Sequence, residues 1–224
     1  MDFEGIFFNT YDYEIDEKII GKGTFGEVHI ATNVNDHQKY AIKLIKTNSD
    51  FNGEEQMNFM RESMILHKFS HPSILKFIGI NFQSIEDQNI LQPSIITEYL
   101  SNGSLYQVLL EEKKGKNDPK WNSTKKFKCL LGIVDALRYL HRQGVLHLDL
   151  KPLNILLDDD FNPKICDFGL SRCIPQSFTK SVQMTITNLG GSPLYMAPEI
   201  LQGETHFGYA VDVYAFGLIA YQIA

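Results

Sequence analysis

The chain has 224 residues, a formal net charge of −6 and 43% hydrophobic residues, which suits one large domain or two small ones with a buried core. This acidic balance offers no basic surface of the kind that nucleic-acid binding needs, so we expect no nucleic-acid partner. The three cysteines are scattered and contain no C-x-x-C pair, which argues against a disulfide framework or a zinc site and indicates free thiols in a reducing compartment.

The first hundred residues have mainly the pattern of β-strands. Residues 13–46 include apolar and polar side chains in alternation and a polar turn, which predicts strands on both sides of that turn. Methionines Met57, Met60 and Met64 then recur at three- and four-residue spacing, which predicts a helix that ends near Pro72. Two further strands are predicted at residues 74–80 and 94–99.

The rest of the chain is mainly helical in pattern. A short helix is predicted over residues 104–112, and a charged loop over residues 113–120. A longer helix is predicted from a cap at Asn122 or Ser123 to Gly144, because glycine commonly ends a helix. Its apolar residues recur at helical spacing: Phe127, Leu130, Leu131, Val134, Leu137 and Tyr139.

Together these elements predict an α+β protein with a small β-rich lobe, a helical lobe and a join near residues 98–103. The apolar run at residues 213–224 is shorter than the roughly 20 residues of a membrane-spanning helix and is predicted to be a buried core helix. The N-terminus carries acidic residues where a signal peptide has basic ones. We therefore expect a soluble, cytoplasmic protein with no membrane partner.

A glycine-rich stretch at residues 21–28 is the first candidate site. Its G-x-G-x-x-G pattern lets backbone N–H groups approach phosphate oxygens closely, although the pattern alone is weak evidence. A dinucleotide-binding loop needs a helix after the glycines, whereas the β-branched residues Val28, Ile30 and Thr32 follow here. The arrangement of strand, glycine loop and strand favours a loop that covers nucleotide phosphates.

Lys43 and Glu62 form the second candidate site. Lys43 lies on the next predicted strand, in Ala41-Ile42-Lys43, and Glu62 lies on the predicted helix that follows. A lysine at such a position is usually a solvent-facing strand residue, and a helix glutamate is usually exposed. Neither residue establishes a site by itself, but a phosphate-binding lysine needs a carboxylate to hold it, and Glu62 is the candidate.

The third pattern is a series of motifs in the second half of the chain. They are His147-Leu148-Asp149-Leu150-Lys151-Pro152-Leu153-Asn154, Asp167-Phe168-Gly169, Met196-Ala197-Pro198-Glu199 and Asp212-Val213-Tyr214-Ala215-Phe216-Gly217. With the glycine loop and Lys43, their order and spacing resemble those of the protein kinase family, which has catalytic-loop, D-F-G and A-P-E elements. The resemblance covers residues 13–224.

The resemblance implies a two-lobed protein kinase fold. The expected parts are an N-lobe at residues 13–97, a hinge at 98–103 and a C-lobe at 104–224. The family's helical lobe continues for several helices beyond the one that starts near Asp212. We therefore expect a C-lobe truncated after the start of its central helix, and a chain that is unstable or poorly active alone.

The resemblance also implies catalytic roles and the cofactors ATP and Mg²⁺. Asp149 would accept the proton of the substrate hydroxyl. Asn154 and Asp167 would hold magnesium, because oxygen ligands suit this hard cation. Lys43, braced by Glu62, would contact the α- and β-phosphates.

Further features imply a serine/threonine kinase. Lys151 would touch the γ-phosphate, and its position two residues after Asp149 is the serine/threonine form. Residues 191–195 look like the peptide-docking loop of such kinases, and residues 212–217 look most like the tyrosine-kinase-like branch. The expected partner is a protein substrate with a serine or threonine acceptor, whereas the sequence does not indicate an oligomeric state.

Similarity to the family also gives the residues expected to bind ATP. Adenine should stack against Ile20, Val28 and Ala41 on one side and Leu156 on the other. Its hydrogen bonds should go to the backbone at residues 98–100, next to a small gatekeeper residue. The full expected set is Ile20, Gly21, Lys22, Gly23, Thr24, Phe25, Gly26, Glu27, Val28, Ala41, Lys43, Thr97, Glu98, Leu100 and Leu156.

Leu66, Phe77, His147 and Phe168 match the family's stacked apolar spine, and Asp212 is expected to anchor its base. Each of the first four would also be an ordinary core residue in this fold. Function and packing therefore coincide at these positions.

Leu148 departs from the family pattern, which has arginine at this position. That arginine pairs with a phosphorylated activation-loop residue, whose phosphate carries up to about −2 charge. Leucine cannot form this pair, so we expect activity to be independent of such a phosphate, unless Arg172 or Lys180 takes the place of the missing arginine. The candidate phosphorylation sites are Thr179, Ser181, Thr185 and Thr187.

Two alternative functions stay open. The truncation and Leu148 favour a catalytically weak or inactive, pseudokinase-like module that binds a nucleotide or a partner. A dual-specificity or tyrosine kinase is the other alternative, and Lys151 argues against it.

Overall fold

The computed structural model describes residues 6–23, 26–45, 53–82, 93–116, 118–174, 182–183, 192–204 and 206–224. The chain forms two compact units. The N-terminal unit comprises Met1–Lys68 and Leu75–Tyr99, and the C-terminal unit comprises Phe69–Ile74 and Leu100–Ala224.

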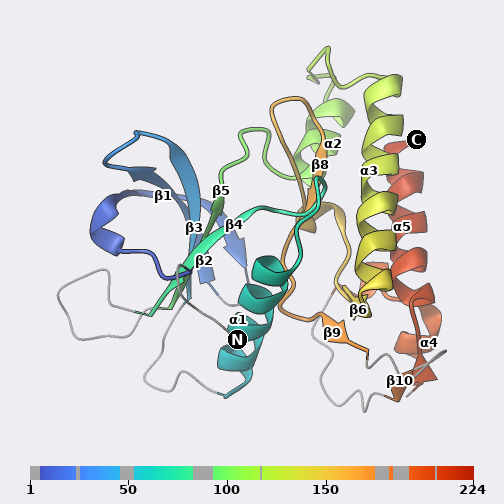
Figure 1. Ribbon diagram of the computed structural model, residues 1–224. Coiled ribbons are helices and arrows are strands. Elements are labelled where there is room, and N and C mark those ends of the chain that lie inside the picture. The colour runs from blue at the N-terminus through green and yellow to red at the C-terminus, as the bar shows by residue number, and fades with distance from the viewer. Residues whose placement is uncertain are drawn as a thin grey trace. The chain divides into compact units, whose positions relative to one another are not determined.

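The N-terminal unit consists of an antiparallel sheet and a helix, α1 (Figure 1). The strands pair in the order β1-β2-β3-β5-β4, so β1 and β4 form the two edges. The polar turn predicted from the sequence lies between β2 and β3. The elements are a 3-10 turn at Thr10–Asp12, β1 (Tyr13–Gly23), β2 (Gly26–Asn33), β3 (Lys39–Ile45), α1 (Gly53–Lys68), β4 (Phe77–Asn81) and β5 (Ser94–Glu98).

Helix α1 forms where the methionine spacing predicted a helix, but the methionines do not form its buried face. Met57, Met60 and Met64 are 60%, 36% and 42% exposed. The buried residues of α1 are Asn58, Phe59, Glu62, Ser63, Ile65 and Leu66. The methionines therefore show the helical period correctly, whereas the packing of α1 near β4 selects a different face.

An apolar cluster lies on one face of the sheet. Ala31, Ile42 and Ile96 form it and are fully buried. Because successive side chains of a strand point to opposite faces, Ile42 and its neighbour Lys43 lie on opposite sides of the sheet. The cluster thus occupies the face away from Lys43.

The C-terminal unit is mainly helical, and α3 and α5 lie side by side in it (Figure 1). Its helices are α2 (Leu105–Lys113), α3 (Ser123–Arg142), α4 (Pro198–Leu201) and α5 (Ala210–Ile223), with 3-10 turns at Pro152–Asn154 and Pro193–Tyr195. Its paired strands are β6 (Val145–Leu146) with β9 (Arg172–Cys173), β7 (Ile155–Leu157) with β8 (Pro163–Ile165), and β10 (Val182–Gln183) with β11 (His206–Phe207). This β-rich unit and mainly helical unit confirm the predicted α+β class.

Side-chain caps fix the starts of α2 and α3. Ser104 accepts a hydrogen bond from the Gln107 backbone N–H at 3.3 Å, and the Gln107 side chain accepts one from the Ser104 N–H at 2.9 Å. This reciprocal pair is a capping box. Asn122 caps α3 by accepting from the Lys125 N–H at 3.1 Å, and Gly144 follows its end with a φ of +76°. The predicted start and stop of α3 are confirmed.

The buried face of α3 differs from the predicted apolar stripe. Phe127, Leu131 and Val134 are 61%, 53% and 42% exposed. The buried residues are Cys129, Ile133, Ala136, Leu137 and Leu140. Of the predicted stripe only Leu137 is buried, because the helix packs on the adjacent series of positions.

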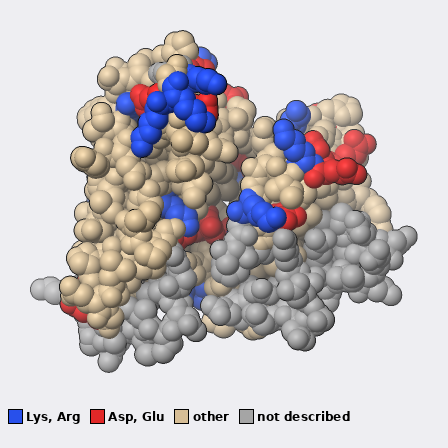
Figure 2. Space-filling view, turned by 180° about the vertical axis from the view of Figure 1, so that it is seen from behind, with Lys and Arg blue, Asp and Glu red and all other residues tan. Residues whose placement is uncertain are grey.

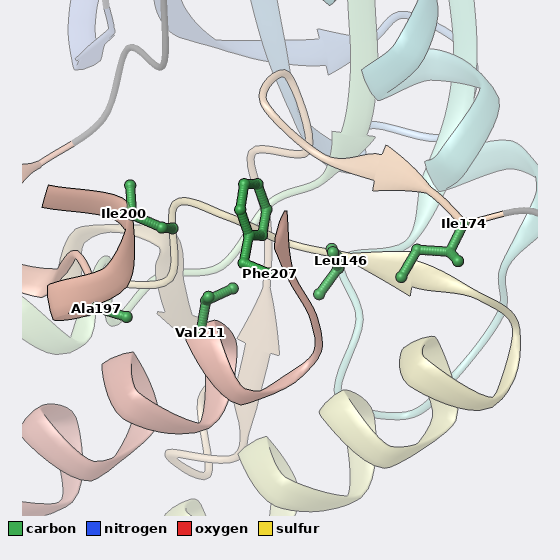
Figure 3. Packing of buried hydrophobic residues seen from close by; sticks show 6 residues of the cluster. All are labelled: Leu146, Ile174, Ala197, Ile200, Phe207 and Val211. Carbon is green, nitrogen blue, oxygen red and sulfur yellow. The ribbon is translucent and has the colours of Figure 1, made fainter. Parts of the chain in front are cut away.

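A second apolar cluster joins the short elements of the C-terminal unit (Figure 3). Its buried members come from β6, the segment after β9, the start of α4, β11 and α5. They are Leu146, Ile174, Ala197, Ile200, Phe207 and Val211. Leu148, Met196 and Tyr209 are half-buried against this cluster.

Charged side chains on the face in Figure 2 occur in small groups of both signs. Local ion pairs include Lys114 with Glu111 at 2.8 Å and Lys126 with Glu112 at 2.9 Å. Among the described helices, none has the length and apolar character needed to cross a membrane.

Candidate active site

Asp149 lies at the centre of the loop between β6 and β7. Lys151 donates to its Oδ2 atom at 2.7 Å, and Asn154 Nδ2 donates to the same atom at 2.9 Å and to the Asp149 carbonyl at 2.8 Å. The Asp149 side chain is 9% exposed and that of Lys151 is 17% exposed. The carboxylate is thus fixed by two donors and lies beside a positive charge.

Asp212, in the first turn of α5, holds the beginning of this loop. It is 1% exposed and accepts hydrogen bonds from the His147 N–H at 2.9 Å and the Leu148 N–H at 3.0 Å. His141 Nε2 donates to it at 2.8 Å. Burial alone would raise the pKa of Asp212, but these hydrogen bonds and the His147 ring hold that pKa below its ordinary value. The carboxylate therefore stays ionised where it binds the loop.

The backbone is strained at two points of the site. Leu148 has a φ of +66° and Asp167 a φ of +63°, in a region that residues with a Cβ rarely adopt. Such strain costs on the order of 1–3 kcal/mol and persists only where the surroundings enforce it. The bond from the Leu148 N–H to Asp212 is one such constraint.

Asp167 belongs to the segment that follows β8. The Cys166 N–H donates to the Asn154 carbonyl at 3.0 Å, so this segment is tied to the end of the Asp149 loop. Phe168 is fully buried and packs on the His147 ring, with centroids 5.0 Å apart. Asn154 Nδ2 donates a hydrogen bond to Asp149, and the other polar atom of this side chain, Oδ1, is an acceptor suited to a cation. An amide oxygen and the Asp167 carboxylate are ligands that fit Mg²⁺.

A small pocket opens beside Asp149. Its lining includes Asp149, Ser192, Tyr195 and Asp212. The 3-10 turn that carries Tyr195 is fixed by a hydrogen bond between the Tyr195 hydroxyl and Gln222 of α5, at 3.1 Å. Asp149 therefore lines the same pocket as Ser192 and Tyr195.

In the N-terminal unit, Lys43 and Glu62 form a short ion pair. Lys43 Nζ lies 2.6 Å from Glu62 Oε2, and the two side chains are 16% and 9% exposed. Lys43 comes from β3 and Glu62 from α1, so the pair links the helix to the sheet. Removing one partner of a buried pair typically costs about 3–5 kcal/mol, because the other charge is left uncompensated.

The described glycines of the glycine-rich stretch lie at the end of β1 and the start of β2, which pair with each other. Gly21 pairs with Val28, and Gly23 pairs with Gly26. The strand β2 after the glycines excludes the helix that a dinucleotide-binding loop needs. Lys22 and Glu27 face each other across the hairpin, with Lys22 Nζ 3.3 Å from Glu27 Oε1. Of the predicted ATP-binding residues, Thr24 and Phe25 lie outside the described residues.

Strand register places several predicted adenine-contacting residues on the same face as Lys43. Val28 lies opposite Lys43, and Thr97 lies opposite Ala41. Directly opposed residues of antiparallel strands share a face, as do residues two apart in one strand. Val28, Ala41, Lys43 and Thr97 therefore form one surface, and Ile20 lies in β1 immediately before the glycines.

The other predicted nucleotide residues are fixed within their own units. In the N-terminal unit, Glu98 Oε1 accepts from the Lys76 N–H at 2.8 Å, immediately after Thr97. In the C-terminal unit, Leu156 pairs with Ser104 in an isolated bridge, and the Leu100 carbonyl accepts from the Gly103 N–H at 3.4 Å.

Sequence reasoning missed His141. This residue binds Asp212 at 2.8 Å and stacks on Tyr209 with ring centroids 4.6 Å apart. Its position four residues after the buried Leu137 was the available signal, because such spacing places both residues on one face of α3. Some predicted residues lie outside the part of the chain that the structure describes. They are Gly191 and the candidate phosphorylation sites Thr179, Ser181, Thr185 and Thr187.

Comparison with known proteins agrees with these motifs. A family model described as "Protein kinase domain" matches residues 13–224. A probable serine/threonine-protein kinase of Dictyostelium discoideum is 38% identical over 221 residues, which cover 99% of this chain and 22% of that protein.

Relatives from other organisms give similar values. The serine/threonine-protein kinase CTR1 of Arabidopsis thaliana is 35% identical, with 95% of this chain and 24% of that protein covered. The NUAK family SNF1-like kinase 1 of Homo sapiens is 36% identical, with 94% of this chain and 29% of that protein covered. The chain thus spans less than a third of the length of these relatives.

Proposed function

Because this chain belongs to the protein kinase family, we propose that it transfers the γ-phosphoryl group of ATP to serine or threonine hydroxyls of proteins. The observation that carries the proposal is the constrained carboxylate of Asp149, a residue that lines a small pocket; Lys151 and Asn154 hold this carboxylate at 2.7 and 2.9 Å. Similarity to serine/threonine kinases supports it.

Phosphoryl transfer depends mainly on positioning and on charge neutralisation. We assign Asp149 to orient the acceptor hydroxyl and accept its proton, and Lys151 to contact the γ-phosphate. Asn154 and Asp167 are assigned as magnesium ligands. When bound, this ion neutralises phosphate charge during transfer. The hydrogen bond from Asn154 Nδ2 to Asp149 holds the proposed base and a proposed metal ligand in a fixed position relative to each other.

The N-terminal unit is assigned to nucleotide binding. Lys43 contacts the α- and β-phosphates, and Glu62 fixes its ammonium group at 2.6 Å. Backbone N–H groups of residues 21–28 cover the phosphates, and the surface of Val28, Ala41 and Thr97 accepts the adenine ring. In this proposal residues 13–97 are the N-lobe, residues 98–103 the hinge and residues 104–224 the C-lobe.

We assign serine/threonine specificity and the tyrosine-kinase-like branch on sequence features. Lys151 stands two residues after Asp149, and residues 212–217 resemble that branch. A cytoplasmic location is also proposed, and the three free cysteines are in keeping with a reducing compartment.

The second candidate is a nucleotide- or partner-binding module without catalysis. Leu148 favours it, because its half-buried side chain packs on an apolar cluster where the family has a phosphate-binding arginine.

The test is phosphorylation of a generic basic protein by the purified chain with labelled ATP and Mg²⁺. Asp149→Asn should lower the rate by about 10²–10⁴-fold, as expected for loss of a positioned base. Asp160→Asn, at an exposed position of the same unit, is the matched control and should keep full activity. Phosphoserine and phosphothreonine should be the products.

Other outcomes discriminate between the two candidates. ATP binding without transfer by the unmodified chain would support the binding module. Phosphotyrosine as the main product would contradict the proposed specificity.

A further inference from the structure

Residues 6–8, which we call the N-terminal flank, pair with the outer edge of β4. These residues precede the part of the chain that the family model matches. The Ile80 N–H donates to the Ile6 carbonyl at 2.8 Å, and the Phe8 N–H donates to the Ile80 carbonyl at 3.1 Å. Phe7 and Ile80 form a parallel bridge. The flank therefore extends the sheet by covering an edge strand.

Two further residues of β4 fit the flank closely. Asn81 Nδ2 donates to the Phe8 carbonyl at 2.8 Å, and the Asn81 side chain is buried. A Cβ atom at Gly79 would lie 2.7 Å from the Ile6 carbonyl oxygen, which is too close for any other residue. Ile6 itself is only 7% exposed. Both β4 and the flank are thus shaped for this contact.

Phe7 and Phe8 reach different neighbours. Phe8 packs against the cluster that contains Ile42, and its ring meets that of Tyr13 at 5.6 Å. Phe7, the alternate residue, instead contacts the Phe82 ring, with centroids 6.3 Å apart. Because side chains of an extended segment alternate between faces, Phe7 points to the face that carries Lys43.

Phe82 connects the flank to α1. Its ring meets that of Phe59 in an edge arrangement with centroids 5.4 Å apart. Phe59 is buried in α1, three residues before Glu62, and this spacing puts both residues on one side of the helix. Glu62 in turn holds Lys43 at 2.6 Å. Ring contacts therefore lead from Phe7 through Phe82 to Phe59, which lies on the same side of α1 as Glu62.

The packed side of α1 combines apolar and polar residues: Ile65 and Leu66 are buried beside Phe59, and the His67 ring meets that of Phe77 in β4 with centroids 5.7 Å apart. The methionines of α1 are exposed, and its buried side includes the polar residues Asn58 and Ser63 as well as Glu62. The Asn58 Nδ2 atom is buried and has no hydrogen-bond partner among the residues that the structure describes, which disfavours this position of the helix. The aromatic contact between Phe59 and Phe82 is therefore one of the contacts that hold α1 in this position.

We propose that the N-terminal flank is a positioning element for Glu62. It acts through Phe7, Phe82 and Phe59, and it keeps α1 where Glu62 can bind Lys43. Displacement of the flank from β4 releases Phe82 and lets α1 move away, which separates the ion pair. The role of the pair in catalysis rests on the proposed function, whereas the coupling of the flank to α1 does not.

The test compares Phe7→Ala and Gly79→Ala with Tyr11→Ala. Phe7 is 59% exposed, so its truncation should not prevent folding, and Tyr11 is 85% exposed and serves as the control. The hydrogen-exchange rate of the α1 backbone amides should rise about two- to tenfold in Phe7→Ala. Loss of the free energy of one aromatic pair changes an opening equilibrium by about this factor. Gly79→Ala should do the same, and Tyr11→Ala should change nothing.

Enzyme kinetics give a second readout. Phe7→Ala should lower kcat/KM for ATP by a similar factor, and Phe7→Tyr should restore it. In a Glu62→Gln background the same truncation should have no further effect, because coupled residues are not additive. Independent effects of Phe7→Ala and Glu62→Gln on kcat/KM, or unchanged exchange in α1, would overturn the proposal. If the unmodified chain transfers no phosphate, the proposed function fails, while hydrogen exchange still decides on the flank.

Discussion

Replacing Asp212 by asparagine perturbs the group that holds the Asp149 loop. The Asp212 carboxylate is 1% exposed and accepts three hydrogen bonds, two from backbone N–H groups and one from His141. Asparagine has nearly the same size but only one acceptor oxygen. Its NH₂ group would have to face one of the donors that now bind the carboxylate.

The expected loss follows from these contacts. A buried donor left without an acceptor costs about 1–3 kcal/mol, and hydrogen bonds to a charged group contribute about 1.5–3 kcal/mol. We therefore expect Asp212→Asn to lower the free energy of unfolding by about 2–4 kcal/mol. For a domain of this size each kcal/mol shifts Tm by about 2–4 °C, so Tm should fall by about 4–16 °C.

Urea and thermal denaturation of the two proteins measure the loss directly. Asp135→Asn is the matched control, because Asp135 is 59% exposed and binds His71 at 3.2 Å on the surface. Exposed pairs contribute at most about 1 kcal/mol, so this variant should melt close to the unmodified chain. Equal losses in the two variants would refute the assignment of Asp212 as the main support of the loop.

The pH dependence has a defined sign. The folded-state pKa of Asp212 lies below its ordinary value of 3.8, so its ionised form stabilises the fold. This contribution is fully present above the unfolded-state pKa and is lost as pH falls through the lower folded-state pKa. The stability difference between the unmodified chain and Asp212→Asn should be constant at neutral pH and should shrink only below about pH 4. A difference that grows on acidification would contradict this reasoning.

Three further predictions concern other parts of the chain. Gly26→Ala should destabilise the β1–β2 hairpin by about 1–3 kcal/mol and raise KM for ATP, because the new Cβ would overlap the Leu44 carbonyl oxygen; an unchanged melting curve would contradict this. Burial raises the pKa of Cys129 to about 12, so iodoacetamide at pH 8 should alkylate the exposed Cys173 and spare Cys129, as peptide mass spectrometry would show. Leu148→Arg should lower stability in urea by about 1–2 kcal/mol, because an apolar contact with the buried cluster is lost; equal or higher stability would refute that packing role.

Local sequence signals predicted much of the secondary structure. The cap at Asn122, the stop at Gly144 and the strand after the glycine loop depend on neighbouring residues, and all three are confirmed. The motifs also identified Lys43 and Glu62, which the structure brings to 2.6 Å. Their catalytic roles stay predictions.

The buried faces of the helices were not predictable in the same way. In α1 the methionines have the right period but are exposed, whereas Phe59 and Glu62 are buried. In α3 the exposed Phe127 belongs to the predicted stripe, whereas Ile133 is buried. A helical period is a local property, but the choice between adjacent faces depends on which surface packs against the helix.

By itself the sequence determined the order of the elements, the family motifs and the residue types for phosphate and metal chemistry, because each is encoded over a few neighbouring positions. The family resemblance already gave Asp212 a supporting role beside His147, but only the tertiary structure decided that His141, 71 residues away in the chain, binds the same carboxylate. The same is true of the contact between the N-terminal flank and β4. Such contacts depend on packing between distant segments, and no local pattern of residues specifies which segments meet.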